Sequence, residues 1–220
     1  MITRATQPFQ FIGCSELQEI LGEHAEDEQE LAELIEEVPV DSIYFHTHSY
    51  FLRHRFIERV YPNDFAQWVE TQVRDHALGE RLAVVDPFDF PSLEALREEL
   101  ISIIDDHLSS TPIVPRVVFG AAFHFNRSRI LEVPTGLEAW TLAEFRNAVS
   151  EVDVSALYYH FFEAHLRLNR EENDFAAWVR SSLGMPEVAD RIRATNPYLG
   201  SLERLRSSLL TVCDEALAPE

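Results

Sequence analysis

The sequence contains no lysine, and all 18 of its basic residues are arginine. Schiff-base catalysis and the lysine of a phosphate-binding P-loop are therefore excluded, because both require an amine side chain. Glycine is also scarce, and none of the seven glycines belongs to a glycine-rich phosphate loop. Two explanations of the arginine bias stay open. One is a GC-rich coding bias, and the other is a cytoplasm of high ionic strength, in which many carboxylates keep proteins dissolved.

Positive charge is also scarce relative to negative charge. The chain carries 38 acidic residues and a formal net charge of -20. Such a field repels phosphate backbones and anionic lipid surfaces, so neither nucleic acid nor a membrane is an expected partner. No apolar run approaches the roughly 18 residues of a spanning helix, and no secretory signal is recognisable. The two cysteines, Cys14 and Cys213, lie in no metal or redox spacing, so the cytoplasm is the expected location.

The common catalytic signatures are absent as well. The sequence contains no Gly-x-Ser-x-Gly, His-Glu-x-x-His or Cys-x-x-Cys pattern. His46 and His48 are two residues apart, which on a helix points their side chains away from each other. We therefore expect no metal site and no cofactor, and the sequence identifies no catalytic residue.

What the sequence does contain is an internal repeat. Residues 8–53 match residues 122–167 without a gap, and the match resumes after a skip of four residues with Asn63-Asp64-Phe65 against Asn173-Asp174-Phe175. Such self-similarity indicates two copies of one unit of about 100 residues. A serine- and proline-rich segment separates the copies. The predicted organisation is a first helical repeat over 1–108, a linker over 109–116 and a second helical repeat over 117–220.

Apolar residues in both copies recur with helical spacing, as Leu31, Leu34, Ile35 and Val38 illustrate. Asn63 and Asn173 are good helix N-caps. The helices they begin should bury Trp68 and Trp178, because each tryptophan follows a phenylalanine by three residues. The predicted fold is mainly α, with two tandem helical repeats related by a pseudo-two-fold axis. At most short extended segments are expected, near Phe9–Phe11 and Val117–Phe125.

A stripe of polar residues recurs inside the aromatic helices. His46 and Arg53 are seven residues apart and share one helical face, and His160, Glu163 and Arg167 form the second stripe. One interpretation is structural, with a core histidine and an arginine paired to a carboxylate. The other is a pocket for a small anion. The candidate ligand-binding residues are His46, Arg53, Asp64, His160, Glu163, Arg167 and Asp174.

Four short blocks follow one another along the chain: Ser-Ile-Tyr-x-His from Ser42, Asn-Asp-Phe-x-x-Trp from Asn63, Asp-Pro-Phe from Asp86, and Ser-Leu-Glu-x-Leu-Arg from Ser92. In this order they resemble a family of uncharacterised prokaryotic proteins, the domain of unknown function family 5752. Residues 156–167 of the second copy resemble the family more closely still. The resemblance implies an accessory role in sugar or trehalose metabolism, and it supplies no catalytic residues to carry over.

The expected function is a non-catalytic helical binding or accessory module, linked to sugar metabolism. Its ligand would be a partner protein or a small anionic metabolite, and self-association stays open. One alternative is an enzyme that uses His46 or His160 as acid or base beside Asp64 or Asp174. A further alternative is an architectural dimerisation unit.

Overall fold

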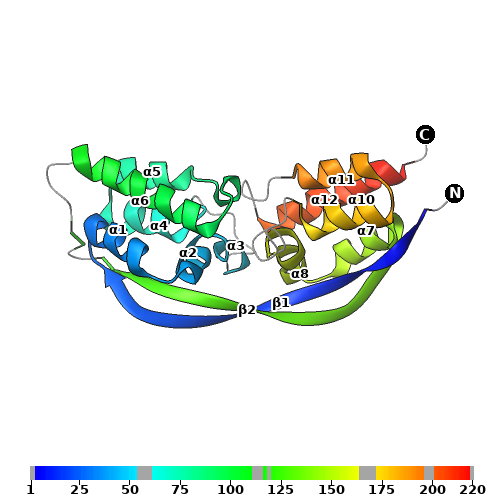
Figure 1. Ribbon diagram of the computed structural model, residues 1–220, viewed down its shortest axis with the longest axis horizontal. Coiled ribbons are helices and arrows are strands. Elements are labelled where there is room, and N and C mark those ends of the chain that lie inside the picture. Colours follow the sequence, from blue (N-terminus) through cyan, green and yellow to red (C-terminus); the bar gives the residue numbers. More distant parts are fainter. Residues whose placement is uncertain are drawn as a thin grey trace. The chain divides into compact units, whose positions relative to one another are not determined.

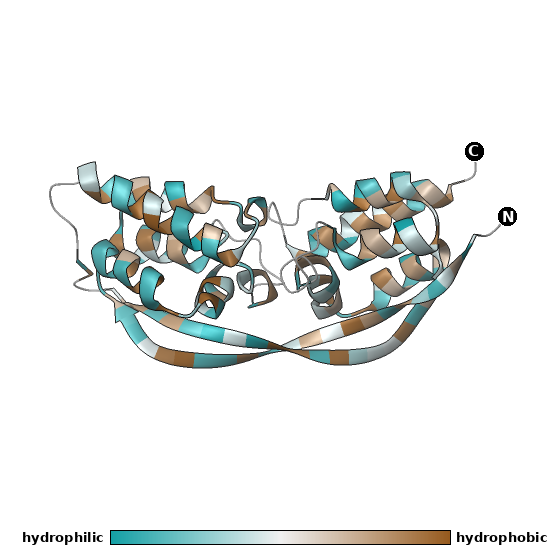
Figure 2. Cartoon of the chain, in the orientation of Figure 1, coloured by the Kyte–Doolittle hydropathy of each residue, from teal (hydrophilic) through white to brown (hydrophobic). Residues whose placement is uncertain are grey.

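The computed structural model describes residues 3–53, 61–110, 116–117, 120–163, 172–195 and 201–218. Two long strands, β1 (Arg4–Ala25) and β2 (Phe123–Thr141), pair in an antiparallel ribbon (Figure 1). Apolar and polar residues are interspersed along both strands (Figure 2). Gly22 in β1 and Gly136 in β2 adopt positive φ angles of 97° and 75°, a backbone conformation that other residues resist.

The ribbon contradicts the predicted fold class. Two tandem helical repeats with at most short extended segments would leave no place for strands of 22 and 19 residues. The expected extension at Phe9–Phe11 lies inside β1, whereas β2 begins only at Phe123 and continues to Thr141. The pattern was missed because more than half of the β1 residues are exposed, so they do not show the strict alternation of a half-buried strand.

The chain forms two compact units that interleave in sequence. The α1–α6 unit contains the described residues of Glu16–Arg53 and Arg59–Arg129, and the α7–α12 unit contains those of Met1–Ser15 and Ile130–Glu220. Each unit therefore includes part of β1 and part of β2. The predicted boundaries 1–108 and 117–220 follow the internal sequence match, so they divide the chain differently from these units.

The α1–α6 unit packs its helices around a single apolar core. Its long outer helices, α1 and α6, contact each other, as do α4 and α5. In α4 the Asn63 side chain accepts a hydrogen bond from Ala66 N at 2.8 Å, which confirms the predicted cap. The elements are α1 (Glu28–Glu37), α2 (Val40–Thr47), α3 (Tyr50–Arg53), α4 (Asp64–Trp68), the π-helical η1 (Val69–Val73), α5 (His76–Ala83), the 3₁₀ turn η2 (Pro87–Asp89) and α6 (Leu93–Ser110).

The α7–α12 unit is also built mainly from helices. α7 packs against α12, and α10 packs against α11. Asn173 caps α10 by accepting a hydrogen bond from Ala176 N at 2.9 Å. Among the described residues, no helix combines the length and apolar character needed to cross a bilayer. The elements are α7 (Leu142–Glu151), α8 (Val154–Tyr158), the π-helical η3 (Tyr159–Glu163), α10 (Asp174–Ser182), α11 (Pro186–Arg193) and α12 (Leu202–Leu217).

Each unit closes its core with a pair of phenylalanines from a strand. Phe123 and Phe125, which share one face of β2, contact Phe65 in the α1–α6 unit. Phe9 and Phe11 of β1 contact Phe175 in the α7–α12 unit in the same way. The strands are therefore part of the cores of both units.

The tryptophans connect the same strand segments to the helices. Trp68 is 6% exposed and its Nε1 donates to the carbonyl of Ala121 at 2.8 Å. Trp178 is 7% exposed and donates to the carbonyl of Gln7, also at 2.8 Å. The predicted burial of both rings is confirmed. Each indole N–H donates to a backbone carbonyl, which lies within β1 for Trp178 and just before β2 for Trp68.

Candidate functional site

His46 stands in the last turn of α2 and is 3% exposed. Its Nδ1 lies 2.8 Å from Asp64 Oδ2, and its Nε2 accepts the backbone N–H of Asn126 in β2 at 3.1 Å. A backbone N–H can only donate, so Nε2 is unprotonated and the ring proton of the neutral histidine resides on Nδ1, facing the carboxylate. His46 therefore links the helix pair α2 and α4 to the β2 backbone.

His160 makes the equivalent set of contacts in the α7–α12 unit. Its Nδ1 lies 3.0 Å from Asp174 Oδ2, and its Nε2 accepts the N–H of Ile12 in β1 at 2.8 Å. The carboxylate holds the ring in the tautomer that the strand requires. In each unit a histidine and an aspartate together anchor one strand to the helices.

The charges around His46 follow from its surroundings. Burial lowers the pKa of His46, and the nearby Asp64 carboxylate opposes this only in part. Burial on its own would raise the pKa of Asp64, but the hydrogen bond from His46 and the positive charge of Arg53 outweigh it, so the Asp64 pKa is lowered. The site therefore holds a neutral imidazole, an ionised carboxylate and a guanidinium.

Arg53 completes this cluster from α3. One guanidinium nitrogen lies 2.6 Å from Asp64 Oδ2 and 2.8 Å from the carbonyl of Phe45, and the group stacks 4.1 Å from the centre of the Phe45 ring. The acceptor of this largely buried cation is a protein carboxylate. That arrangement favours the structural interpretation of the polar stripe, because the guanidinium charge already faces a carboxylate of the chain itself.

The other predicted residues are distributed as follows. Glu163 is 2% exposed at the end of the π-helical segment η3. Arg167 lies outside the described residues, so its place in the second stripe stays a prediction. The structure thus brings His46, Arg53 and Asp64 together in one unit, and His160 and Asp174 together in the other.

This geometry limits the chemistry open to the two histidines. A general acid or base must present a ring nitrogen to a substrate. Both nitrogens of His46 and of His160 are already bonded, one to a carboxylate and one to a strand amide. Acid–base catalysis at either ring would require release of the strand from the helices. The arrangement is suited to anchoring.

A further buried polar cluster was missed by the sequence reasoning. Glu28, Asp75 and His107 meet inside the α1–α6 unit, although they are far apart in the chain. Comparing the two copies for agreement could not reveal them, because the second copy has Leu142, Met185 and Ala216 at those positions.

Comparisons with known proteins agree with the resemblance of the sequence blocks. The model of a family of unknown function, DUF5752, matches residues 6–214. The chain belongs to this family. The solved structure of OrfY from Thermoproteus tenax is similar to this DUF5752 chain, with a TM-score of 0.81, 26% sequence identity and 98% of each chain covered. A search of curated proteins finds no match. Neither the family description nor the name OrfY states an activity.

Proposed function

We propose that this protein is a non-catalytic accessory module that binds a partner protein with a basic surface. The observation that carries the proposal is the surplus of carboxylates, 38 against 18 arginines. Many of the described arginines are already neutralised by the chain's own acids, so the remaining field is negative. Complementary charge speeds association with a basic partner and disfavours acidic ones.

The arginine side chains support this description of the surface. Arg146 pairs with Asp214 at 2.7 Å, Arg127 with Glu19 at 2.8 Å, and Arg116 with Glu26 at 2.6 Å. Arg97 instead donates to the backbone carbonyls of Glu36 and Val38 at the end of α1, at 3.0 and 2.7 Å. These contacts leave the cations with partners in the chain itself, which speaks against an anionic metabolite as the main ligand.

The acidic surface has a specific hollow on the α1–α6 unit. It is open to solvent, lies along α1 and α6, and presents mostly carboxylates. The carboxylates that line this hollow, such as Glu98 and Asp105, are exposed, so in the free protein they are charged and hydrated. A lysine- or arginine-rich protein surface is the chemistry that fits it. The lining residues are Glu36, Glu98, Ile101, Ser102, Asp105 and Asp106.

The partner we favour is an enzyme of sugar metabolism, on the strength of the family resemblance. We also propose that the chain arose by internal duplication, which the matching roles of His46 and His160 support.

A cytoplasmic location is consistent with two buried free thiols, Cys14 and Cys213. Burial raises the pKa of the Cys213 thiol to about 12, which keeps it unreactive.

The test compares two double variants of the full chain as bait in a lysate of the source organism. Glu98→Gln/Asp105→Asn removes two charges from the hollow, and Glu151→Gln/Glu187→Gln removes two exposed charges from the α7–α12 unit as a control. We expect one protein to bind the parent and the control in stoichiometric amount, to be lost from the hollow variant, and to dissociate as salt rises. The proposal would be refuted if no protein binds the parent in stoichiometric amount. It would also be refuted if the bound protein stays on the hollow variant and does not dissociate as salt rises.

A further inference from the structure

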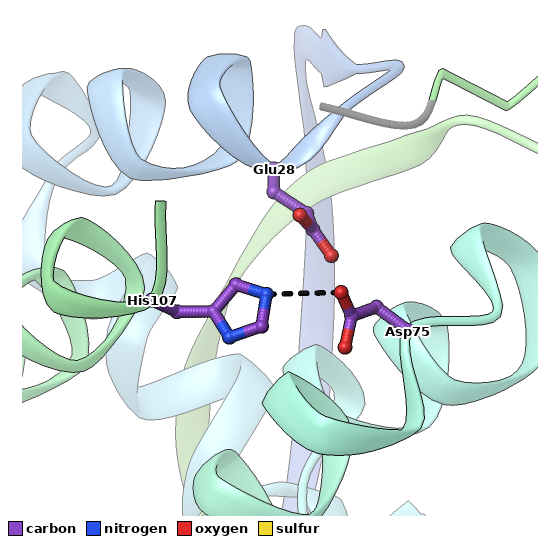
Figure 3. Close-up of side chains that lie close together, drawn as sticks. All are labelled: Glu28, Asp75 and His107. Atoms are coloured by element: carbon purple, nitrogen blue, oxygen red, sulfur yellow. Dashed lines mark hydrogen bonds and ion pairs between the residues drawn. The ribbon is translucent and has the colours of Figure 1, made fainter. Parts of the chain in front are cut away.

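Three helices of the α1–α6 unit direct polar side chains to one buried point (Figure 3). Glu28 is the first residue of α1, Asp75 is the N-cap of α5, and His107 lies near the end of α6. One ligand-type atom from each residue lies within 4.8 Å of the other two. A carboxylate, a second carboxylate and an imidazole therefore converge from parts of the chain that are distant in sequence.

Glu28 is the member whose position needs an explanation. It is 0% exposed, and neither of its carboxylate oxygens has a hydrogen-bond partner in the described part of the chain. Burial raises its pKa to about 7, with added contributions from Asp75 and Asp27. A buried carboxyl group without partners is costly, so folded proteins seldom retain one unless something else binds it.

Asp75 and His107 are already oriented for a shared ligand. Asp75 Oδ1 accepts the N–H of Leu78 at 2.9 Å, which fixes the carboxylate at the start of α5. Its other oxygen, Oδ2, lies 2.9 Å from His107 Nε2. A carboxylate held by a second hydrogen bond is the usual support for a metal ligand. Glu28 then faces this pair with both oxygens unpaired.

The α7–α12 unit builds the same helices without these groups. Its α7 begins with Leu142, its α11 has Met185 as the N-cap, and the fifteenth residue of α12 is Ala216, where the fifteenth residue of α6 is His107. The fold therefore does not require the polar cluster. A group retained at a cost in one unit and replaced by apolar side chains in the other has a purpose beyond packing.

We propose that Glu28, Asp75 and His107 bind a divalent first-row transition ion of the Zn²⁺ type, with water in the fourth position. One imidazole and two carboxylates are ligands that Zn²⁺ accepts, whereas Ca²⁺ and Mg²⁺ prefer oxygen ligands alone. The two carboxylates balance the ion's charge. On binding, the ion takes the place of the proton between His107 Nε2 and Asp75 Oδ2. A neutral ring regains a proton on Nδ1 through water, a charged ring releases the Nε2 proton to water, and any proton on Glu28 also leaves to water.

The geometry needs only a small adjustment. A tetrahedral ion with ligands at about 2.0–2.2 Å holds them roughly 3.4 Å apart. The contact between Asp75 and His107 must lengthen slightly, and rotation of the Glu28 side chain brings its oxygen closer. The side chains of Asp75 and His107 are 17% and 11% exposed, which gives an ion a path from solvent. The ion would join the start of α1, the start of α5 and the end of α6.

The experiment measures metal binding to the full chain after treatment with a chelator. Zn²⁺, Co²⁺, Mg²⁺ and Ca²⁺ are each titrated by calorimetry, and the Co²⁺ complex is examined for the visible absorption of a tetrahedral site. We expect one Zn²⁺ per chain and a raised melting temperature. Binding should weaken at least 100-fold in Glu28→Leu and in His107→Ala, which take the residues of the other unit, and in the isosteric Glu28→Gln.

Two variants control for adventitious histidine sites. His76 contacts Glu70 at the surface, and the rings of His24 and His124 lie tilted to each other with their centres 5.7 Å apart. His76→Ala and His24→Ala should bind Zn²⁺ like the parent. The proposal fails if the folded parent binds no stoichiometric Zn²⁺, or if the Glu28 variants, shown to be folded by circular dichroism, still bind it. Tighter binding of Ca²⁺ than Zn²⁺ would refute the assigned class of ion.

Discussion

The buried carboxyl of Glu28 makes the metal-free protein sensitive to pH in a way that can be calculated. Its pKa is raised from 4.5 to about 7 in the folded protein. The folded state therefore holds this proton more tightly than the unfolded state does. Below about pH 4.5 the carboxyl is protonated in both states, so its ionisation adds no penalty to the folded state. As pH rises through the folded pKa, unfolding becomes easier, and the full penalty is present above about pH 8.

The size of the effect follows from the shift. About 2.5 pKa units at about 1.36 kcal/mol each give roughly 3 kcal/mol. Glu28→Leu removes the titrating group and supplies the side chain that Leu142 provides in the other unit. We expect the variant to be more stable than the metal-free parent at pH 8. The difference between the two should grow by about 2–3 kcal/mol between pH 5 and pH 8.

The assay is urea denaturation at pH 5, 6, 7 and 8 with a chelator present. Glu33→Leu serves as the matched control, because Glu33 is exposed on the same helix. That variant should follow the pH dependence of the parent. A difference between Glu28→Leu and the parent that stays constant within about 0.5 kcal/mol from pH 5 to pH 8 would contradict the reasoning, because such a result would mean that Glu28 ionises freely.

Three other predictions concern the fold. Trp68→Ala and Trp178→Ala should each lower the free energy of unfolding by about 3–5 kcal/mol in urea denaturation, since both rings are buried; losses below about 1 kcal/mol would contradict this. Arg74 and Gly184 both adopt a φ of 68°, a conformation that glycine tolerates better than other residues. Arg74→Gly should therefore raise the free energy of unfolding by about 1 kcal/mol, and Gly184→Ala should lower it by a similar amount. Changes of the opposite sign in urea denaturation would refute this argument. The fragment 1–108 lacks all of β2 and should show no cooperative thermal transition by circular dichroism.

Local features of this protein were predictable from its sequence. The caps at Asn63 and Asn173 and the burial of Trp68 and Trp178 depend on neighbouring residues, and all four predictions are confirmed. These features are encoded within one or two helical turns. They position the histidine–aspartate pairs, because Asp64 and Asp174 directly follow the caps.

The ribbon could not be predicted in the same way. Glu16 to Leu21 consists of glutamate, leucine, glutamine and isoleucine, most of them helix formers, yet it lies within β1. Two of its apolar residues, Leu17 and Ile20, are 58% and 79% exposed, so no alternation marks the strand. Its partner strand begins roughly 100 residues later in the chain, and no local pattern identifies such a pairing.

For the site residues too, local features could be predicted from the sequence and long-range contacts could not. The sequence pointed to His46 and Arg53 as one stripe, but their shared partner Asp64 belongs to another helix, and the acceptor role of His46 Nε2 depends on Asn126 in β2. These contacts are long-range, and they decide whether the histidine is available for chemistry. Propensity and periodicity carry no information about them.

The central claim is that the paired histidines anchor the strands to the helices. Nitrogen NMR of the imidazole rings of His46 and His160 tests it most directly. We predict for both rings a neutral tautomer with the proton on Nδ1, and for Nε2 a bare nitrogen that accepts the amides of Asn126 and Ile12. A proton on Nε2 of either ring at neutral pH, with the strand amide exchanging freely, would contradict the claim.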